Sequence, residues 1–499
     1  MSDRTYEIIA LAIYFAGMIA IGYYAYRQTS DHEGYMLAGR NLPSWAAALS
    51  AGASDMSGWL MMGLPGAIYV AGLIESWIAI GLTVGAYLNW RLVAPRLRAY
   101  SEVSRNSITI PSFFENRLRD HTHLLRIASA VIVLVFFTFY VSSGMVAGGV
   151  FFESSFDSPY LAGMLLVAGV TLSYTLFGGF LGASLTDVAQ GVMMMVALVV
   201  VPILAIAELG GPADTLDAIR AVDPDHLSML AGEPLTWATF VSIVSAAAWG
   251  LGYFGQPHII VRFMALRNPA AATSARRIGM TWMIISLIGA VTAGLVGVAY
   301  FAETGAELGD PETVVLTMSQ LLLHPLVAGF VLAAVLAAIM STISSQLIVC
   351  SSALVEDLYK LAAKTPPAPR TLILLGRSCV LAVAVVAALL AIEPGDTILE
   401  LVGFAWAGFG ASFGPAILLC LFWRRLTNIG AAAGMVAGAV TVFAWDAWGT
   451  DLYEIVPGFL VNLVVAVVVS LMTYRDNPEI DAEFDQAASL VDKRAKTAA

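Results

Sequence analysis

The stretch Ser50-Ala51-Gly52-Ala53-Ser54-Asp55-Met56-Ser57-Gly58-Trp59 decides the architecture of this chain. It lies inside an apolar segment, roughly residues 42–70, that is long enough to cross a bilayer. A carboxylate at mid-membrane costs about 2.5–3.5 kcal/mol even on a lenient insertion scale, and glycine and serine weaken a helix. We therefore predict a helix that breaks here and turns carbonyls, hydroxyls and the Asp55 carboxylate toward a bound ion or polar solute. The alternative is small-residue packing against a neighbouring helix, with Asp55 paired to a hydroxyl.

Composition places the chain in a membrane. Of its 499 residues 59% are hydrophobic and 12% are charged, whereas soluble proteins average about 25% charged residues. The first apolar run follows Asp3 and Arg4 almost at once, so we expect no removable signal peptide. The three cysteines show no metal-ligand spacing, and we expect inert core residues. These features predict an all-α polytopic protein of the lipid bilayer with no nucleic-acid partner.

Hydropathy predicts thirteen spans, and the basic residues predict their orientation. The spans are approximately 6–26, 43–70, 74–94, 124–152, 159–178, 187–208, 236–261, 279–301, 325–356, 371–392, 397–423, 428–447 and 453–473. With the N-terminus outside, every lysine and arginine except Arg4 and Arg220 lies on the cytoplasmic side or beside it. We therefore expect one transmembrane domain, 1–475, in a bacterial plasma membrane, and a short cytoplasmic tail, 476–499, that is disordered.

A second break is predicted in span seven, at Trp249-Gly250-Leu251-Gly252-Tyr253-Phe254-Gly255-Gln256-Pro257. Three glycines and a proline argue against a continuous helix, although a kinked helix with a glycine packing face is the alternative. The breaks stand five spans apart. Interrupted segments at matching places in two halves indicate an inverted-repeat transporter, with repeats at about 43–208 and 236–423.

Span nine adds a cluster of oxygen donors in Ala338-Ile339-Met340-Ser341-Thr342-Ile343-Ser344-Ser345-Gln346. A lone hydroxyl pair usually bonds back to its own helix, but this stretch holds four hydroxyls and an amide. Hydroxyl and carbonyl oxygens suit a hard cation such as the sodium ion. The Ala338 carbonyl lies on the same helical face as Ser341 and Thr342. Of the other charges near the membrane, Glu75, Asp187 and Arg377 are expected to have structural roles at helix ends.

At these stretches the chain resembles the sodium/solute symporter family. The matching strings are Gly39-Arg40, Leu49 to Leu60, Glu75 to Gly81, Phe177 to Phe180, Trp249 to His258, Met340 to Thr342, Glu356 to Lys360 and Ala405 to Gly410. The resemblance implies a five-plus-five inverted repeat of the leucine-transporter type, with one leading and two trailing helices. It also implies coupling of inward sodium flow to solute uptake by alternating access. The likeness is greatest to members that carry proline, which makes L-proline the expected solute.

The resemblance also implies site residues. The sodium site would use the carbonyls of Ala53, Met56 and Ala338 with the hydroxyls of Ser341 and Thr342, and Asp55 would be the critical carboxylate beside it. The substrate pocket would consist of Ser57, Gly58, Trp59, Tyr140, Trp249, Tyr253 and Pro257.

The same residues make chemical sense for a zwitterion. A helix that starts near Ser57-Gly58-Trp59 offers backbone amides and a favourable dipole to a carboxylate. Aromatic walls suit an apolar ring. The alternatives left open are a sodium symporter for another small solute (pantothenate, a monocarboxylate or a sugar) and, less favoured, a sensor or channel of the same fold. We expect no enzyme, because the six histidines form no intramembrane metal motif, and we expect a functional monomer.

Overall fold

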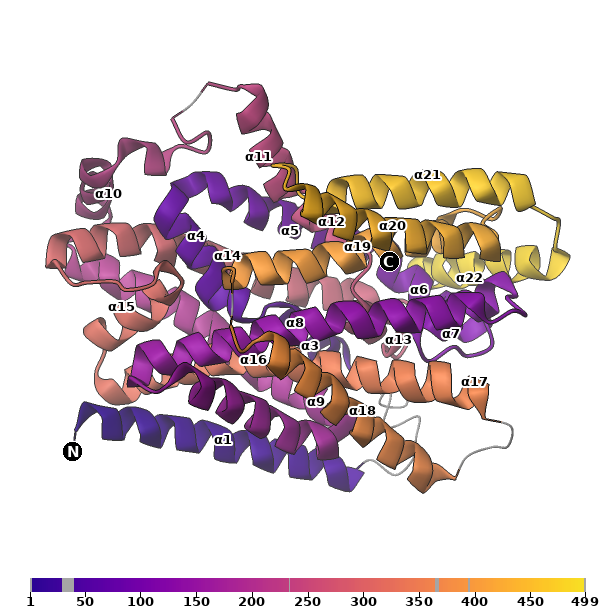
Figure 1. Cartoon of the computed structure of the whole chain (residues 1–499), viewed down its shortest axis with the longest axis horizontal. Helices are drawn as coiled ribbons and strands as arrows, with labels where there is room; N and C mark the ends of the chain where they lie inside the picture. Colours follow the sequence, from indigo (N-terminus) through magenta and orange to yellow (C-terminus); the bar gives the residue numbers. More distant parts are fainter. Residues whose placement is uncertain (1, 29–39, 233, 364–367, 394, 498–499) are drawn as a thin grey trace.

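In a computed structural model of the chain, residues 2–28, 40–232, 234–363, 368–393 and 395–497 are described. Within these ranges the secondary structure is helical, with one isolated β-bridge between Leu42 and Leu266. Figure 1 shows the long helices running lengthwise across the view, with α10 and α15 toward one end and α7 and α17 toward the other.

The first half of the chain contains α1 to α10. The α-helices are α1 (Asp3–Gln28), α3 (Ser44–Asp55), α4 (Leu64–Ala71), α5 (Ser76–Leu88), α6 (Ala94–Val103), α7 (Ile110–Leu118), α8 (Leu124–Phe156), α9 (Tyr160–Glu208) and α10 (Pro212–Val222). The shorter turns between them are η2 (Trp59–Gly63), η3 (Gly72–Glu75), η4 (Asn89–Val93) and, after α10, η5 (Pro224–Leu227).

The second half contains α11 to α22. The α-helices are α11 (Trp237–Ala247), α12 (Trp249–Gly252), α13 (Pro257–Met264), α14 (Ala271–Thr304), α15 (Val314–Leu322), α16 (Pro325–Ser352), α17 (Lys360–Ala362), α18 (Pro369–Leu390), α19 (Ile398–Phe422), α20 (Asn428–Trp448), α21 (Ile455–Thr473) and α22 (Pro478–Thr497). The turns are η6 (Pro311–Thr313) and η7 (Ala353–Tyr359).

The all-helical membrane fold predicted from hydropathy is confirmed, but the count of thirteen spans is not. Eleven stretches of the described residues are long and apolar enough to cross a membrane. Predicted span three and much of span two fall in one stretch, Trp59–Val103, because η3 joins α4 to α5 without a polar loop. Predicted span five corresponds to the shorter apolar helix Tyr160–Leu176, which continues into the rest of α9.

The expectation that the tail, 476–499, is disordered was wrong for the residues that the structure describes. The last two residues, 498 and 499, lie outside the described ranges. Residues Pro478–Thr497 form α22, which packs against α6. The Phe484 ring meets the Tyr100 ring edge-on at 6.1 Å, and Glu483 pairs with Arg119 at 2.6 Å. A helix of low hydrophobicity is fixed here by a few tertiary contacts, which hydropathy alone does not reveal.

The two predicted breaks lie at the centre of the molecule. The helix α3 packs against α9, α13, α14 and α16, and α12 packs against α5 and α19. Glycines bring α5 against the second break: a Cβ at Gly85 would stand 2.1 Å from the Gly250 carbonyl oxygen. Because a larger residue would collide with backbone there, these glycines fix the depth at which the second break lies.

Candidate functional site

The first break is built as the sequence predicts. The helix α3 ends at Asp55, Met56 leaves helical geometry with φ −84° and ψ 86°, and the chain resumes helical structure at η2. Glycine, serine and aspartate in the preceding turn weaken the helix, so its last carbonyls are free to face other elements. One of them, that of Ala53, accepts a hydrogen bond from the Ser341 hydroxyl of α16 at 2.8 Å.

The predicted sodium ligands of α3 and α16 converge at this point. The Ser341 hydroxyl also reaches the Ala338 carbonyl at 3.0 Å, and the Thr342 hydroxyl reaches the same carbonyl at 3.3 Å. Met56 lies in the non-helical turn and its side chain is fully buried. The structure thus places four of the five predicted donor groups in contact, although they come from segments 288 residues apart.

Asp55 joins the two breaks. Its carboxylate accepts a hydrogen bond from the hydroxyl of Tyr253, the residue that directly follows α12. Its backbone carbonyl accepts from the Trp59 indole at 3.1 Å and from the Tyr140 hydroxyl at 3.4 Å. The other carboxylate oxygen, Oδ1, is buried and has no hydrogen-bond partner among the described residues. A buried carboxylate with spare acceptor capacity is suited to respond to a cation close by.

The aromatic residues expected to wall the substrate form one cluster across the breaks. The rings of Trp59 and Trp249 lie 6.1 Å apart, and Tyr253 meets Trp406 edge-on at 5.2 Å. Trp406 also donates its indole N–H to the Trp249 carbonyl at 2.8 Å. Trp59, Trp249 and Tyr253 are all buried, so the cluster lies between α3, α12 and α19 instead of facing lipid.

Trp406 was not among the predicted site residues. The signal was present, because it stands in the matching string Ala405 to Gly410, where small residues surround one tryptophan. A Cβ on Gly252 would lie 1.9 Å from the Trp406 indole nitrogen. The glycine at that position therefore leaves the room that the ring occupies.

The remaining predicted pocket residues are placed unequally. Ser57 is buried in the first break, and its amide donates to the Asp55 carbonyl at 3.1 Å. Gly58 packs toward Ala147 of α8. Pro257 begins α13 and lines a small cavity of about 30 Å³ with Phe180 and Asp357, away from the tryptophan cluster. The structure gathers the other predicted pocket residues around Asp55 and leaves Pro257 at the edge.

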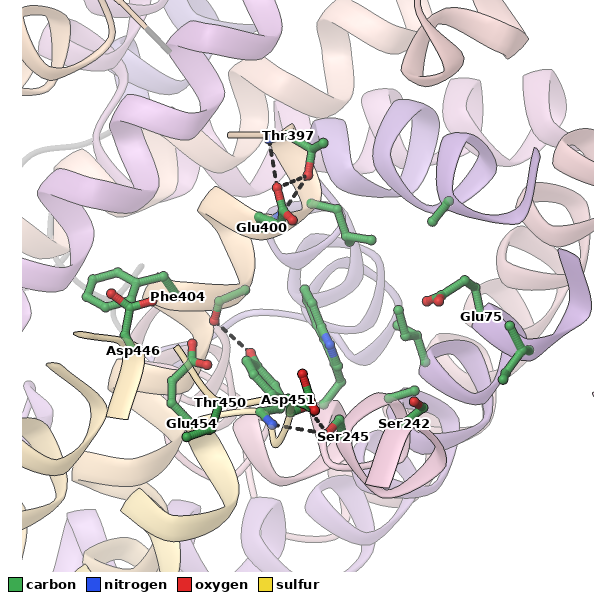
Figure 2. Close-up of a pocket in the computed structure, with 18 residues that line it drawn as sticks. Glu75, Ser242, Ser245, Thr397, Glu400, Phe404, Asp446, Thr450, Asp451 and Glu454 are labelled. Carbon is green, nitrogen blue, oxygen red and sulfur yellow. Dashed lines mark hydrogen bonds between the residues drawn. The ribbon is translucent and has the colours of Figure 1, made fainter. Parts of the chain in front are cut away.

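A vestibule opens beside Trp249, which is one of its lining residues. Its volume is about 550 Å³, and its walls come from α4, η3, α5, α11, α12, α19, the end of α20 and the loop that follows it. Figure 2 shows its carboxylates, with Glu75 on one side, Asp446 and Glu454 on the other, and Glu400 and Asp451 between them. Burial, with Asp446 nearby, raises the pKa of Glu454 to about 7.

The expectation that Asp187 and Arg377 lie at helix ends was wrong, because they lie inside α9 and α18, where each has a partner. Asp187 of α9 pairs with Arg262 of α13 at 3.0 Å and accepts the Ser50 hydroxyl at 2.7 Å. Arg377 of α18 donates to the Leu176 carbonyl at 3.2 Å. Glu75 instead lines the vestibule. The Asp187–Arg262 pair ties α3, α9 and α13 together beside the first break.

Comparison with known proteins assigns the sequence of this chain to a family. The profile of the sodium:solute symporter family matches residues 35–438. The chain is 52% identical over 472 residues to the osmoregulated proline transporter OpuE of Bacillus subtilis, covering 94% of this chain and 95% of that one. It is 53% identical over 470 residues to the high-affinity proline transporter PutP of Bacillus subtilis, covering 94% and 98%. It is 49% identical over 496 residues to the sodium/proline symporter of Staphylococcus aureus, covering 97% and 96%.

Solved structures show the same fold at low sequence identity. A Na⁺-coupled sialic acid symporter in a substrate-bound, outward-open state superposes with a TM-score of 0.80 at 18% identity, over 94% of this chain and 98% of that one. The nucleobase-cation-symport-1 family transporter Mhp1 superposes with a TM-score of 0.54 at 15% identity, over 91% and 98%. On the family match and the relatives at about half identity, this chain belongs to the sodium:solute symporter family.

Proposed function

We propose that this protein is a secondary transporter that couples inward sodium flow to uptake of L-proline by alternating access. The observation that carries the proposal is the meeting of the Ser341 hydroxyl with the carbonyls of Ala53 and Ala338 at the break of α3. The names of the relatives supply the solute, because three proteins at about half identity are a proline transporter or a sodium/proline symporter.

The sodium ion would bind where the oxygens of α3 and α16 meet. Its ligands would be the carbonyls of Ala53, Met56 and Ala338 with the hydroxyls of Ser341 and Thr342. These are neutral oxygens, which suit a hard monovalent cation, and Asp55 supplies the negative charge close by. Since Asp55 also holds Tyr253, a cation here would act on both breaks at once.

The solute would lie beside the cation, among Trp59, Trp249 and Tyr253. A carboxylate would face the start of the helix that runs from Trp59 through α4, where amides and dipole favour an anion. A pyrrolidine ring would pack on the aromatic faces. A sugar would need more hydrogen-bond partners than these indole and phenol rings provide, which favours proline over the sugar alternative.

The energetics are sufficient for accumulation. One charge that crosses 100 mV releases about 2.3 kcal/mol, and about 1.4 kcal/mol is a tenfold ratio. One sodium ion per solute therefore sustains roughly a 40-fold gradient per 100 mV, before any sodium gradient is added.

The membrane placement follows from charge and from the family. Basic residues of α6, α7 and η4 gather at one end of the bundle, which would face the cytoplasm of a bacterial cell with the N-terminus outside. The vestibule, lined by carboxylates, would open to the outside and attract sodium. The domain limits 1–475 and 476–499 and a functional monomer are part of the same proposal.

The decisive test is uptake of radiolabelled L-proline into proteoliposomes that contain the purified full chain. We expect accumulation that requires an inward sodium gradient and rises with an inside-negative potential. Equal uptake in sodium and choline buffers would reject sodium coupling. Sodium-driven uptake of pantothenate or a monocarboxylate, with none of proline, would reject the solute and leave the family intact.

A further inference from the structure

The loop between α20 and α21 reaches the roof of the proposed substrate pocket. Tyr453, in this loop, stacks on Trp249 with ring centroids 5.5 Å apart and planes at 24°. Trp249 in turn lies 6.1 Å from the buried ring of Trp59 and stacks on Trp406 at 6.3 Å. The order Tyr453, Trp249, Trp59 therefore leads from the vestibule to the buried site.

Three hydrogen bonds fix this loop to the elements that frame the pocket. The Tyr453 hydroxyl donates to the Gly403 carbonyl of α19 at 2.6 Å. The Tyr453 amide donates to the Ser245 hydroxyl of α11 at 3.0 Å, and that hydroxyl donates to the Asp451 carbonyl at 3.2 Å. One residue from outside the predicted repeats thus bridges the helix before the second break and the helix that carries Trp406.

Gly403 packs closely on the Trp249 ring and lies in ordinary contact with Tyr453. A Cβ on Gly403 would lie 3.3 Å from the Trp249 ring and 3.8 Å from the Tyr453 hydroxyl oxygen. Trp249 is 7% exposed, although it borders a vestibule of about 550 Å³. Its ring therefore lies between the vestibule and the buried aromatic cluster.

We propose that Tyr453 is a positioning residue that holds Trp249 over the substrate pocket and seals the pocket from the vestibule. The inference rests on the proposed function, because it takes the enclosed solute to be proline. Its action is indirect: Tyr453 acts on Trp249, and Trp249 contacts the solute. Loss of the hydroxyl should let the Trp249 ring swing outward, so that bound proline escapes to the vestibule faster.

The matched substitutions are Tyr453→Phe, Tyr453→Ala and Tyr160→Phe. The Tyr160 hydroxyl donates to the Ala391 carbonyl at 2.8 Å, which is the same type of bond away from the pocket. Removing one hydrogen bond should speed proline release about two- to tenfold in Tyr453→Phe, and further loss of the ring stack should make Tyr453→Ala faster still. Tyr160→Phe should release proline at the wild-type rate.

The measurement is the dissociation of tritiated proline from purified full-length protein after addition of excess unlabelled proline, followed by scintillation proximity at saturating sodium. The sodium concentration for half-maximal binding should stay within about twofold in all variants, because its proposed ligands lie on other atoms. A general loss of structure would shift both quantities. Wild-type release rates in both Tyr453 variants would overturn the inference.

A second measurement tests the seal without any solute. Cysteine in place of Ser57 reports on access to the pocket, and the native cysteines Cys350, Cys379 and Cys420 are buried. In detergent-solubilised protein, we expect Ser57→Cys to react at least about fivefold faster with a methanethiosulfonate reagent when Tyr453→Ala is also present. An unchanged rate would reject the seal even if the solute proved not to be proline. Absence of sodium-driven proline uptake by the wild type would instead reject the proposed function.

Discussion

At the residue scale, Asp55 is the point through which the two breaks communicate. Its side chain holds Tyr253 of the second break, while its own carbonyl holds Trp59 and Tyr140. Ser341 of α16 bonds to the Ala53 carbonyl at the same break, and Thr342 bonds to the Ala338 carbonyl one turn away on α16. The cation ligands and the solute wall therefore share one turn of backbone but use different atoms, so single substitutions should separate them.

Removal of a hydroxyl ligand should weaken sodium binding first. We expect Ser341→Ala or Thr342→Ala to raise the sodium concentration for half-maximal proline uptake at least about tenfold, because one oxygen of a small coordination shell is lost. The control is Ser286→Ala, since the Ser286 hydroxyl bonds back to the Trp282 carbonyl of its own helix at 2.9 Å. The measurement is the sodium dependence of initial uptake rates. An unchanged sodium dependence in both variants would remove these hydroxyls from the cation site.

Removal of the Trp249 ring should weaken proline binding and spare sodium binding, and removal of the Tyr253 ring should also weaken proline binding. Trp249→Ala and Tyr253→Ala each remove a contact worth on the order of 1–3 kcal/mol, about 5- to 150-fold in affinity. Tyr253→Phe keeps the ring and removes the hydrogen bond to Asp55, so it separates the contribution of the ring from that of the bond. If the aromatics acted as a lid alone, equilibrium proline binding would stay near normal while turnover fell. Scintillation-proximity binding at saturating sodium, beside the transport rate, distinguishes the two roles.

At the element scale, the turn η6 fixes the start of α19. Glu312 accepts hydrogen bonds from the amides of Ile398 at 3.0 Å and Leu399 at 3.2 Å, so its carboxylate caps that helix. The same turn packs on α4, where a Cβ at Gly66 would lie 2.8 Å from the Glu312 Cα. One residue thus links the two helices: its backbone packs on α4 after the first break, and its side chain caps α19, which carries Trp406.

This cap should make stability depend on pH. Burial raises the pKa of Glu312 from 4.5 to about 7, against the lowering effect of the two amides. Because the pKa of Glu312 is higher in the folded state than in the unfolded state, protonation of Glu312 stabilises the fold. This stabilisation is complete below about pH 4.5 and is lost as the pH rises through about 7. We expect Glu312→Gln to reduce the fall in thermal midpoint between about pH 5 and pH 8. The control is Glu307→Gln, at an exposed position between α14 and η6. Equal pH slopes in wild type and Glu312→Gln would contradict the prediction.

At the scale of the whole molecule, the bundle has a basic end and an acidic end. The helix α22 packs on α6 at the basic end, and the vestibule occupies the other. Figure 1 shows the N-terminus at the same end as α10 and α15. If the basic end faces the cytoplasm, solute enters at the vestibule and leaves on the side of α6 and α7.

Cysteine labelling should establish this orientation. Cysteines placed at Asp225 and Glu307 should react with an impermeant thiol reagent added to intact cells, and one at His121 should react only after permeabilisation. All three positions are exposed, so reactivity reports on sidedness. Ser104 lies at the same basic end as His121 but is buried, so a cysteine there would not react from either side of the membrane. The opposite labelling pattern would reverse the proposed direction of transport.

The sequence by itself determined the membrane class, both breaks and the hydroxyl face of α16. Each of these depends on local chemistry: the cost of a carboxylate in lipid, the weak helix propensity of residues 50–58 and 249–257, and oxygen donors spaced three and four residues apart. They could be read without knowing which helices are neighbours.

The tertiary structure alone decided the partners. That Asp55 meets Tyr253, that Trp406 completes the aromatic cluster and that Tyr453 covers it depend on contacts between segments far apart in the chain. The packing of α22 on α6 has the same origin, as does the position of Pro257 at the edge of the cluster. Each of these side chains would fit equally well against many apolar surfaces, so no local pattern specifies its partner. The partner is decided by how all the helices pack together.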